Sequence, residues 1–124
     1  MTTDKNKQQF EKWYNVKFRL DLISSINSNN YIVSTSPSID SFYKLPFEMQ
    51  IGVYLAYYDS LGIIIDIEAD LYNDKNVFLY IWHINSFFEW DCSSHNDIPP
   101  FKTRNEAYKE AFKKADELIN KQLC

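Results

Sequence analysis

The last quarter of the chain, residues 101–124, constrains the fold most, because it predicts one long helix with a single apolar face. Thr103 and Glu106 have the spacing of a capping box, in which each side chain bonds the backbone N–H of the other residue. Small and apolar residues follow at steps of three and four: Ala107, Ala111, Phe112, Ala115, Leu118, Ile119 and Gln122. Because small residues allow close approach, we expect this helix to dock on a sheet.

The chain has the size and composition of one folded domain spanning residues 1–124. It has 124 residues, of which 45% are hydrophobic and 17% aromatic, against two glycines. Such a composition is typical of a globular protein with one core. The first residues lack the apolar stretch of a signal peptide, and the longest apolar run, residues 61–65, is far too short to cross a bilayer. We therefore expect a cytoplasmic protein without membrane contact, in which Cys92 and Cys124 are free thiols.

Two further segments have the spacing of helices. Residues 4–14 begin with a capping aspartate and place Phe10, Trp13 and Tyr14 on one side. Residues 45–61 have Pro46 in the first turn, where proline is tolerated, and end before Gly62, which suits the left-handed position after a helix. The sequence therefore predicts an N-terminal and a central helix. Residues 16–26 fit a strand and a helix equally, so we leave their conformation open.

The segment after Gly62 alternates as strands do. Residues 63–68, 77–84 and 87–91 predict three antiparallel strands, with a loop at residues 71–76 and a turn at residues 85–86. Residues 31–33 and 39–44 are candidates for two more short strands. The predicted fold is α+β, with an antiparallel sheet of three to five strands and the central and C-terminal helices packed on one face.

Charge is distributed unevenly along the chain. Residues 1–20 carry five basic and two acidic side chains, residues 21–100 two basic and eleven acidic, and residues 101–124 six basic and four acidic. The middle of the chain therefore repels nucleic-acid phosphates and attracts basic partners. Within it, Asp66, Glu68 and Asp70 alternate with apolar residues, which places three carboxylates on one face of a strand. We interpret this row as a recognition surface, and a solvated outer face is the simpler alternative.

Aromatic residues exceed what one helix on one sheet face can bury. Those that raise the question are Tyr54, Tyr57, Tyr58, Tyr72, Tyr80, Trp82, Phe87, Phe88 and Trp90. Since Tyr and Trp are common anchors of protein interfaces, we expect some of them to remain exposed. The predicted partner-binding residues are the three carboxylates together with Tyr72, Trp82 and Trp90. Stacking on single-stranded nucleic acid is the competing use, but it normally comes with a basic groove.

The segment containing Cys92 and His95 has the residue types of reactive sites. A structural zinc ion needs four ligands, and the other soft candidates, His83 and Cys124, do not lie at ligand spacing. A nucleophilic Cys–His pair also needs an orienting group and an oxyanion hole, which a polar loop does not preorganise. His83 itself is expected to be a solvated or hydrogen-bonded strand residue that faces away from its neighbours. The sequence thus predicts no metal, no cofactor and no catalytic residue.

Three segments, LPFEMQIGVYL at residues 45–55, YDSLG at residues 58–62 and KTRNEA at residues 102–107, resemble a small family of uncharacterised phage and prophage proteins of AT-rich Bacteroidota. The composition agrees, since residues with AT-rich codons far outnumber those with GC-rich codons. The resemblance assigns no role to particular residues. It implies a context, because short phage proteins without enzymatic motifs are often inhibitors of host defence, including anti-CRISPR proteins.

We therefore expect a non-enzymatic protein whose acidic, aromatic surface occupies a basic surface on a host protein or ribonucleoprotein, as an anti-CRISPR protein would. The alternative is a nucleic-acid-binding module with a basic patch from the two terminal helices: Lys5, Lys7, Lys12, Arg19, Lys109, Lys113 and Lys114. A small hydrolase using Cys92 and His95 ranks third. The oligomeric state stays open.

Overall fold

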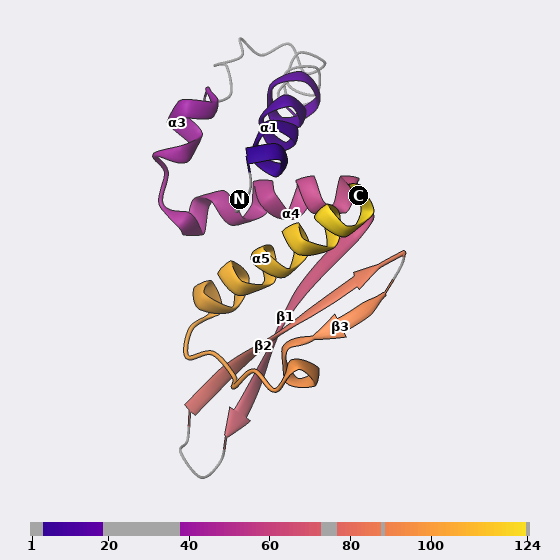
Figure 1. Cartoon of the computed structure of the whole chain (residues 1–124). Coiled ribbons are helices and arrows are strands. Elements are labelled where there is room, and N and C mark those ends of the chain that lie inside the picture. Colours follow the sequence, from indigo (N-terminus) through magenta and orange to yellow (C-terminus); the bar gives the residue numbers. More distant parts are fainter. Residues whose placement is uncertain (1–3, 19–37, 73–76, 88, 124) are drawn as a thin grey trace, which may run out of the picture.

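The chain folds into a layer of helices on one side of an antiparallel sheet (Figure 1). A computed structural model describes residues 4–18, 38–72, 77–87 and 89–123. The elements in chain order are α1 (Asp4–Trp13), the π-helical turn η1 (Tyr14–Phe18), α3 (Ile39–Tyr43), α4 (Phe47–Ser60), β1 (Ile63–Tyr72), β2 (Val77–Ser86), β3 (Trp90–Cys92), the 3₁₀ turn η2 (Ser93–Asn96) and α5 (Arg104–Leu123). This architecture confirms the predicted α+β class.

The sheet within the described residues has three antiparallel strands in the order β1-β2-β3. In the pairing of β1 with β2, Asp66 lies opposite His83, and in the pairing of β2 with β3, His83 lies opposite Cys92. Beyond the end of β3, Phe101 exchanges two backbone hydrogen bonds of 2.8 Å with Tyr80 of β2. The strand predicted at residues 31–33 lies outside the described residues.

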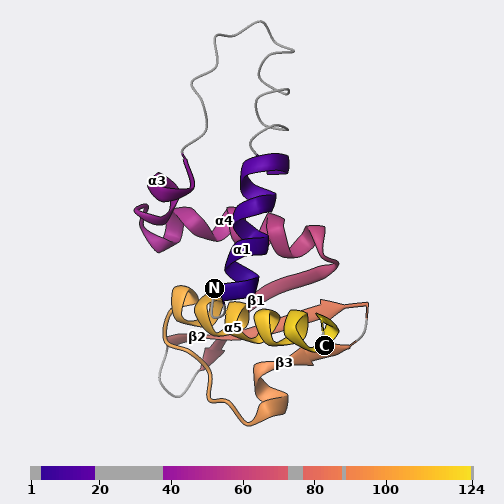
Figure 2. The same cartoon turned by 45° about the horizontal axis from the view of Figure 1, so that its top comes forward.

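The predicted apolar stripe of α5 faces the sheet. Ala107, Ala111 and Ala115 are fully buried, and α5 contacts both β1 and β2. Opposite them, Ile65 and Ile84 are buried on the same side of the sheet. Figure 2 shows α5 lying along the sheet, with α1, α3 and α4 on that same side. The prediction that the central and C-terminal helices share one face is confirmed.

Two of the three local signals at the helix ends behave as predicted, whereas Pro46 lies just before its helix rather than in the first turn. The Glu106 backbone N–H donates to the Thr103 hydroxyl at 3.1 Å, and α5 begins directly after this cap. Gly62 follows α4 with a φ of 77°, the left-handed conformation that lets the chain turn straight into β1. The helix itself begins at Phe47, one residue after Pro46.

The strand predicted at residues 39–44 is wrong, because this segment forms α3. Ser38 caps it, since the Ser41 backbone N–H donates to the Ser38 hydroxyl at 3.2 Å. Only Phe42 of this short helix is buried. The segment therefore lacks the alternation of buried and exposed residues that a strand of the sheet would have. The Gln50 side-chain amide of α4 lies 2.9 Å from the Leu45 carbonyl and 3.2 Å from the Phe42 carbonyl, which holds the turn between the two helices.

The boundaries of the strands also differ from the prediction. β1 continues through residues 71–72, which were expected in a loop, and β2 continues through residues 85–86, which were expected to turn. The turn comes later, where the Ser86 backbone N–H donates to the Glu89 carbonyl at 3.0 Å. β3 is accordingly shorter than the predicted strand 87–91. Cross-strand pairing as far as Ile63 opposite Ser86 outweighs the turn preference of the polar pair at 85–86.

Three of the nine aromatic residues in question, the tyrosines of α4, are buried inside the helical layer. The Phe10 ring of α1 lies 5.0 Å from the Tyr54 ring and 5.3 Å from the Tyr57 ring of α4, and 5.7 Å from Phe42 of α3, between centroids. All four rings are buried, as is Tyr58. The sequence predicts less burial of rings, because its pattern suggests one helix on the sheet and does not reveal the second group of helices behind it.

A buried carboxylate joins three helices at the base of this layer. Asp116 of α5 is fully buried and accepts a 2.7 Å hydrogen bond from the Tyr58 hydroxyl of α4. The Asn6 side-chain amide of α1 donates to the Asp116 backbone carbonyl at 3.2 Å. Burial, helped by the negative charge of Asp116, raises the pKa of Tyr58 strongly and that of Tyr54 and Tyr57 to about 12.

The two glycines provide a matched test of the backbone at the α4–β1 junction. Gly62→Ala should destabilise the protein by about 1–2 kcal/mol, because an L-residue is strained at positive φ, and its Cβ would collide with the Phe87 ring. Gly52→Ala should instead stabilise by about 0.5–1 kcal/mol, because position 52 is helical with open space around it. Urea unfolding of both variants measures this, and an equal effect at the two positions would contradict it.

The buried tyrosines predict a loss of stability at high pH. Because the pKa of Tyr57 is raised from 10.0 to about 12 in the folded state, its stabilising contribution is complete below pH 10 and is lost as pH rises towards 12. Tyr57→Phe should make the fall of the unfolding free energy between pH 10 and 12 shallower. At pH 7 the variant should differ little, because this hydroxyl has no hydrogen-bond partner among the described residues. Urea titrations at each pH measure the slope, and an unchanged slope would refute the assignment.

Candidate protein-binding surface

The side of the sheet that faces away from α5 is the candidate site, and we call it the open face. It consists of alternate residues of the two long strands: Ile64, Asp66, Glu68 and Asp70 of β1, and Leu79, Ile81, His83 and Asn85 of β2. These residues are exposed or half-buried, whereas Ile63, Ile65, Trp82 and Ile84 on the other side are buried. The strand alternation predicted from sequence therefore separates a covered from an uncovered face.

The predicted row of carboxylates lies on this open face. Asp66, Glu68 and Asp70 are spaced at two-residue intervals, about 6.7 Å apart along a strand. The Glu68 carboxylate lies 2.7 Å from Nε2 of His83, with 52% of the glutamate and 30% of the histidine side chain exposed. Neither β1 nor β2 contains a lysine or arginine. The row is therefore a compact acidic surface in which His83 is the only nearby group of the two strands that can become positive.

Trp90 closes one end of the open face. It pairs with Asn85 in the register of β3, which places it on the same side of the sheet as His83, and half of it is exposed. Its ring centroid lies 4.8 Å from His95 in an edge-to-face arrangement and 6.3 Å from His83. The sequence analysis predicted Trp90 but missed its two histidine neighbours, although the strand alternation already placed His83 on this side.

Of the two other predicted aromatic residues, Trp82 does not join this surface. Trp82 is 2% exposed and faces the helices, so it belongs to the core and we exclude it from the site. The prediction failed because alternation defines two faces without saying which one a helix will cover. Tyr72 ends β1 opposite Val77, and its side chain is outside the described part of the structure.

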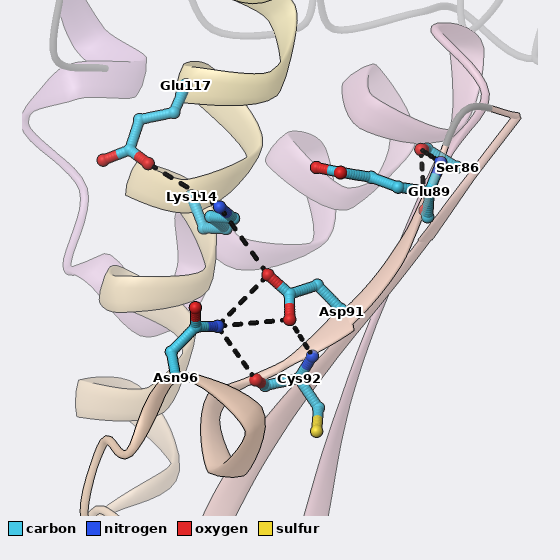
Figure 3. Close-up of polar contacts among 7 residues, drawn as sticks. All are labelled: Ser86, Glu89, Asp91, Cys92, Asn96, Lys114 and Glu117. Carbon is cyan, nitrogen blue, oxygen red and sulfur yellow. Dashed lines mark hydrogen bonds and ion pairs between the residues drawn. The ribbon is translucent and has the colours of Figure 1, made fainter.

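A polar network anchors the strand that carries Trp90 (Figure 3). Asp91, the next residue, accepts hydrogen bonds of 3.1 Å at both carboxylate oxygens from the Asn96 side-chain amide, and one of 2.9 Å from the Cys92 backbone N–H. Lys114 of α5 reaches towards it from the helical side, with Nζ 3.6 Å from the carboxylate. β3 is thus tied both to η2 and to α5, which holds Trp90 in a defined place.

The geometry around Cys92 gives no support to a hydrolase. The thiol is buried and lies 3.0 Å from the Ser94 hydroxyl, whereas His95 packs on Trp90. Among the described contacts there is no hydrogen bond between Cys92 and His95, which a nucleophile and its base require. No group of three His, Cys, Asp or Glu side chains in the described ranges is arranged to hold a metal ion.

The basic residues of the terminal helices are divided among several partners. Lys113 pairs with Glu110 at 3.2 Å, while Lys114 is turned towards Asp91 on β3. Lys7 lies over the Tyr43 ring, which is on α3. Arg19 falls outside the described residues. The lysines described here are therefore partly neutralised and directed to different neighbours, which weakens the case for one phosphate-binding patch.

Comparisons with protein-family models, curated proteins and solved structures found no match to this chain. Within residues 4–18, 38–72, 77–87 and 89–123, the helices are all too short or too polar to cross a membrane.

The Asp91 network generates a prediction about stability. Asp91→Ala should lower the unfolding free energy by about 1–3 kcal/mol, because it removes the acceptor of the part-buried Cys92 backbone N–H and of the exposed Asn96 amide. Glu117→Ala is the control, since Glu117 is exposed and only reaches Lys114 at 4.0 Å. Urea unfolding compares the two, and a loss from Glu117→Ala as large as that from Asp91→Ala would contradict the role given to Asp91.

Proposed function

We propose that this chain is a non-enzymatic binding protein that docks its open face on a basic surface of a partner protein. The observation that carries the proposal is the row of Asp66, Glu68 and Asp70 on an uncovered sheet face that has an exposed tryptophan at its end. Among the described residues Asp66 and Asp70 form no ion pair, so their charges are available to pair across an interface. Trp90 supplies the kind of large, held aromatic that concentrates binding energy.

Electrostatics determines which partner this face accepts. Three like charges about 6.7 Å apart raise one another's energy modestly in water, and an opposed basic surface relieves that repulsion. The same charges accelerate encounter with a basic protein and disfavour nucleic-acid phosphates. Following the resemblance of residues 45–55, 58–62 and 102–107 to phage proteins, we propose a host-defence protein or its RNA complex as the partner, inhibited in the manner of an anti-CRISPR protein.

A charge-matched pair of variants tests the proposal. In the face variant, Asp66→Asn, Glu68→Gln and Asp70→Asn neutralise the open face. In the control variant, Glu106→Gln, Glu110→Gln and Glu117→Gln change the net charge equally on exposed positions of α5. Partners are recovered from a Bacteroidota lysate on wild-type protein, identified by mass spectrometry, and their affinity is then measured with purified components. We expect the face variant to bind about tenfold more weakly and the control variant to bind as wild type does.

The recovery is repeated after nuclease treatment. A basic partner that persists, and that the face variant fails to bind, supports the proposal. Equal affinity of the two variants for the partner would remove the open face from the function. Recovery that disappears with nuclease would favour the nucleic-acid alternative, in which case a gel shift should show binding that falls steeply with salt.

A further inference from the structure

Within the described residues, β1 is an edge strand of the sheet as well as part of the open face. The strand order leaves it with one neighbour, β2, and it is 10 residues long. Among the described residues, no backbone hydrogen bond outside the β1–β2 ladder involves this strand. A long edge strand is a template for a further strand, and folded proteins normally shorten, charge or cover such an edge.

The direction of the free backbone groups follows from β2. Both backbone groups of Tyr80 bond Phe101, so they point away from β1. Because these groups alternate along a strand, the neighbours Leu79 and Ile81 bond β1, at Asp70 and Glu68. The intervening residues of β1 therefore direct their N–H and C=O groups outward from the sheet: Ile63, Ile65, Ile67, Ala69 and Leu71.

Side chains along this edge specify what can add to it. On the open face, an added strand would place every second side chain about 5 Å from Asp66, Glu68 or Asp70. On the opposite side, near the β1–β2 hairpin end, Leu71 is 50% and Phe78 57% exposed. Basic side chains suit the first side and apolar ones the second. The edge thus matches an extended segment in which basic and apolar residues alternate.

A second copy of the chain does not match this edge. If two β1 strands paired antiparallel about Glu68, each Glu68 would face its copy, and each Asp66 would face the Asp70 of the other chain. Like charges directly opposite on one face are destabilising. The acidic row therefore works against self-pairing while leaving the edge open to a segment of opposite charge.

We propose that β1 is a docking edge for an extended protein segment of alternating basic and apolar residues, which adds to the sheet as a strand beside β1. This inference rests on the proposed function, because the same three carboxylates select the partner, and it specifies how the partner is held. Main-chain hydrogen bonds to Ile65, Ile67 and Ala69 supply affinity, and the carboxylates supply selectivity.

The probe is a synthetic peptide of about nine alternating Lys and Val residues, close to the length of β1. It is acetylated, amidated and fluorescently labelled, and its binding is followed by anisotropy. A peptide of the same composition with all lysines preceding all valines is the control, because it carries the charge without the alternation. Hydrogen exchange of the wild-type protein should show new protection at the amides of Ile65, Ile67 and Ala69 only with the alternating peptide.

Two substitutions at one position separate the edge from the charges. Ala69→Pro removes an outward N–H without removing a bond to β2, as proline on an edge strand permits. Ala69→Val keeps that N–H and is the matched control. We expect the alternating peptide to bind Ala69→Pro at least about tenfold more weakly, and Ala69→Val as it binds wild type. Circular dichroism and urea unfolding establish that both variants are folded.

The possible results separate the docking edge from the proposed function. Binding that Ala69→Pro and the face variant both weaken, with the expected amide protection, supports the docking edge. Binding weakened only by the face variant, without that protection, overturns the edge and leaves the proposed function standing. Failure of both variants to weaken binding overturns the two together, whereas an absence of peptide binding overturns the docking edge and leaves the proposed function to its own test with the recovered partner. Protection that appears without peptide and rises with protein concentration, together with a dimer in sedimentation equilibrium, overturns the edge in favour of a second copy. If Ala69→Pro is unfolded, the exchange pattern of the wild type alone decides.

Discussion

The hydrogen-bonded burial of Asp116 is the constraint on which the arrangement of helices depends. A carboxylate excluded from water is tolerated only where donors surround it, and the Tyr58 hydroxyl supplies one at 2.7 Å. That bond sets α5 against α4, and the bond from Asn6 to the Asp116 carbonyl adds α1 to the same point. With α5 held in this orientation, its alanine stripe can only meet the sheet. In the described part of the chain, α1, α4 and α5 then lie on one side, and no described helix covers the acidic face of the sheet.

Sequence reasoning succeeded where the signal was local. The cap at Thr103, the left-handed Gly62 and the alternation across Asp66 and Glu68 each depend on a few neighbouring residues, and the structure contains all three features. It failed for Trp82, because only the position of α5 decides which side of β2 is covered. Asp116 was overlooked for a related reason. It falls on the buried stripe four residues after Phe112, and a charged residue there is a signal of a buried polar bond that could have been read.

The fate of the aromatic residues shows how tertiary structure redistributes what composition suggests. The surplus of rings indicated an exposed aromatic surface, yet Phe10, Phe42 and Tyr54 meet in a core between α1, α3 and α4. A strand was predicted where α3 forms. Without this helix, fewer aromatic rings were expected to be buried. Among the predicted anchors, Trp90 alone has a described side chain that is both exposed and held in place by neighbours.

The alternation of side chains along β1 leaves both an apolar residue and the carboxylates exposed on the open face, and the carboxylates make the face selective for charge. A sheet face that carries Ile64 and a half-exposed Trp90 beside an unpaired edge invites indiscriminate association. The carboxylates further along β1 give that face a single sign of charge, so surfaces that are neutral or acidic gain little from approaching it. Since His83 already lies against Glu68, a basic partner must either accept that pair or displace it, whereas Asp66 and Asp70 are not tied to a lysine or arginine of their own two strands. Asp66 and Asp70, at the two ends of the row, therefore contribute most to selecting a basic partner. Glu68 at the centre contributes less, because it already contacts His83.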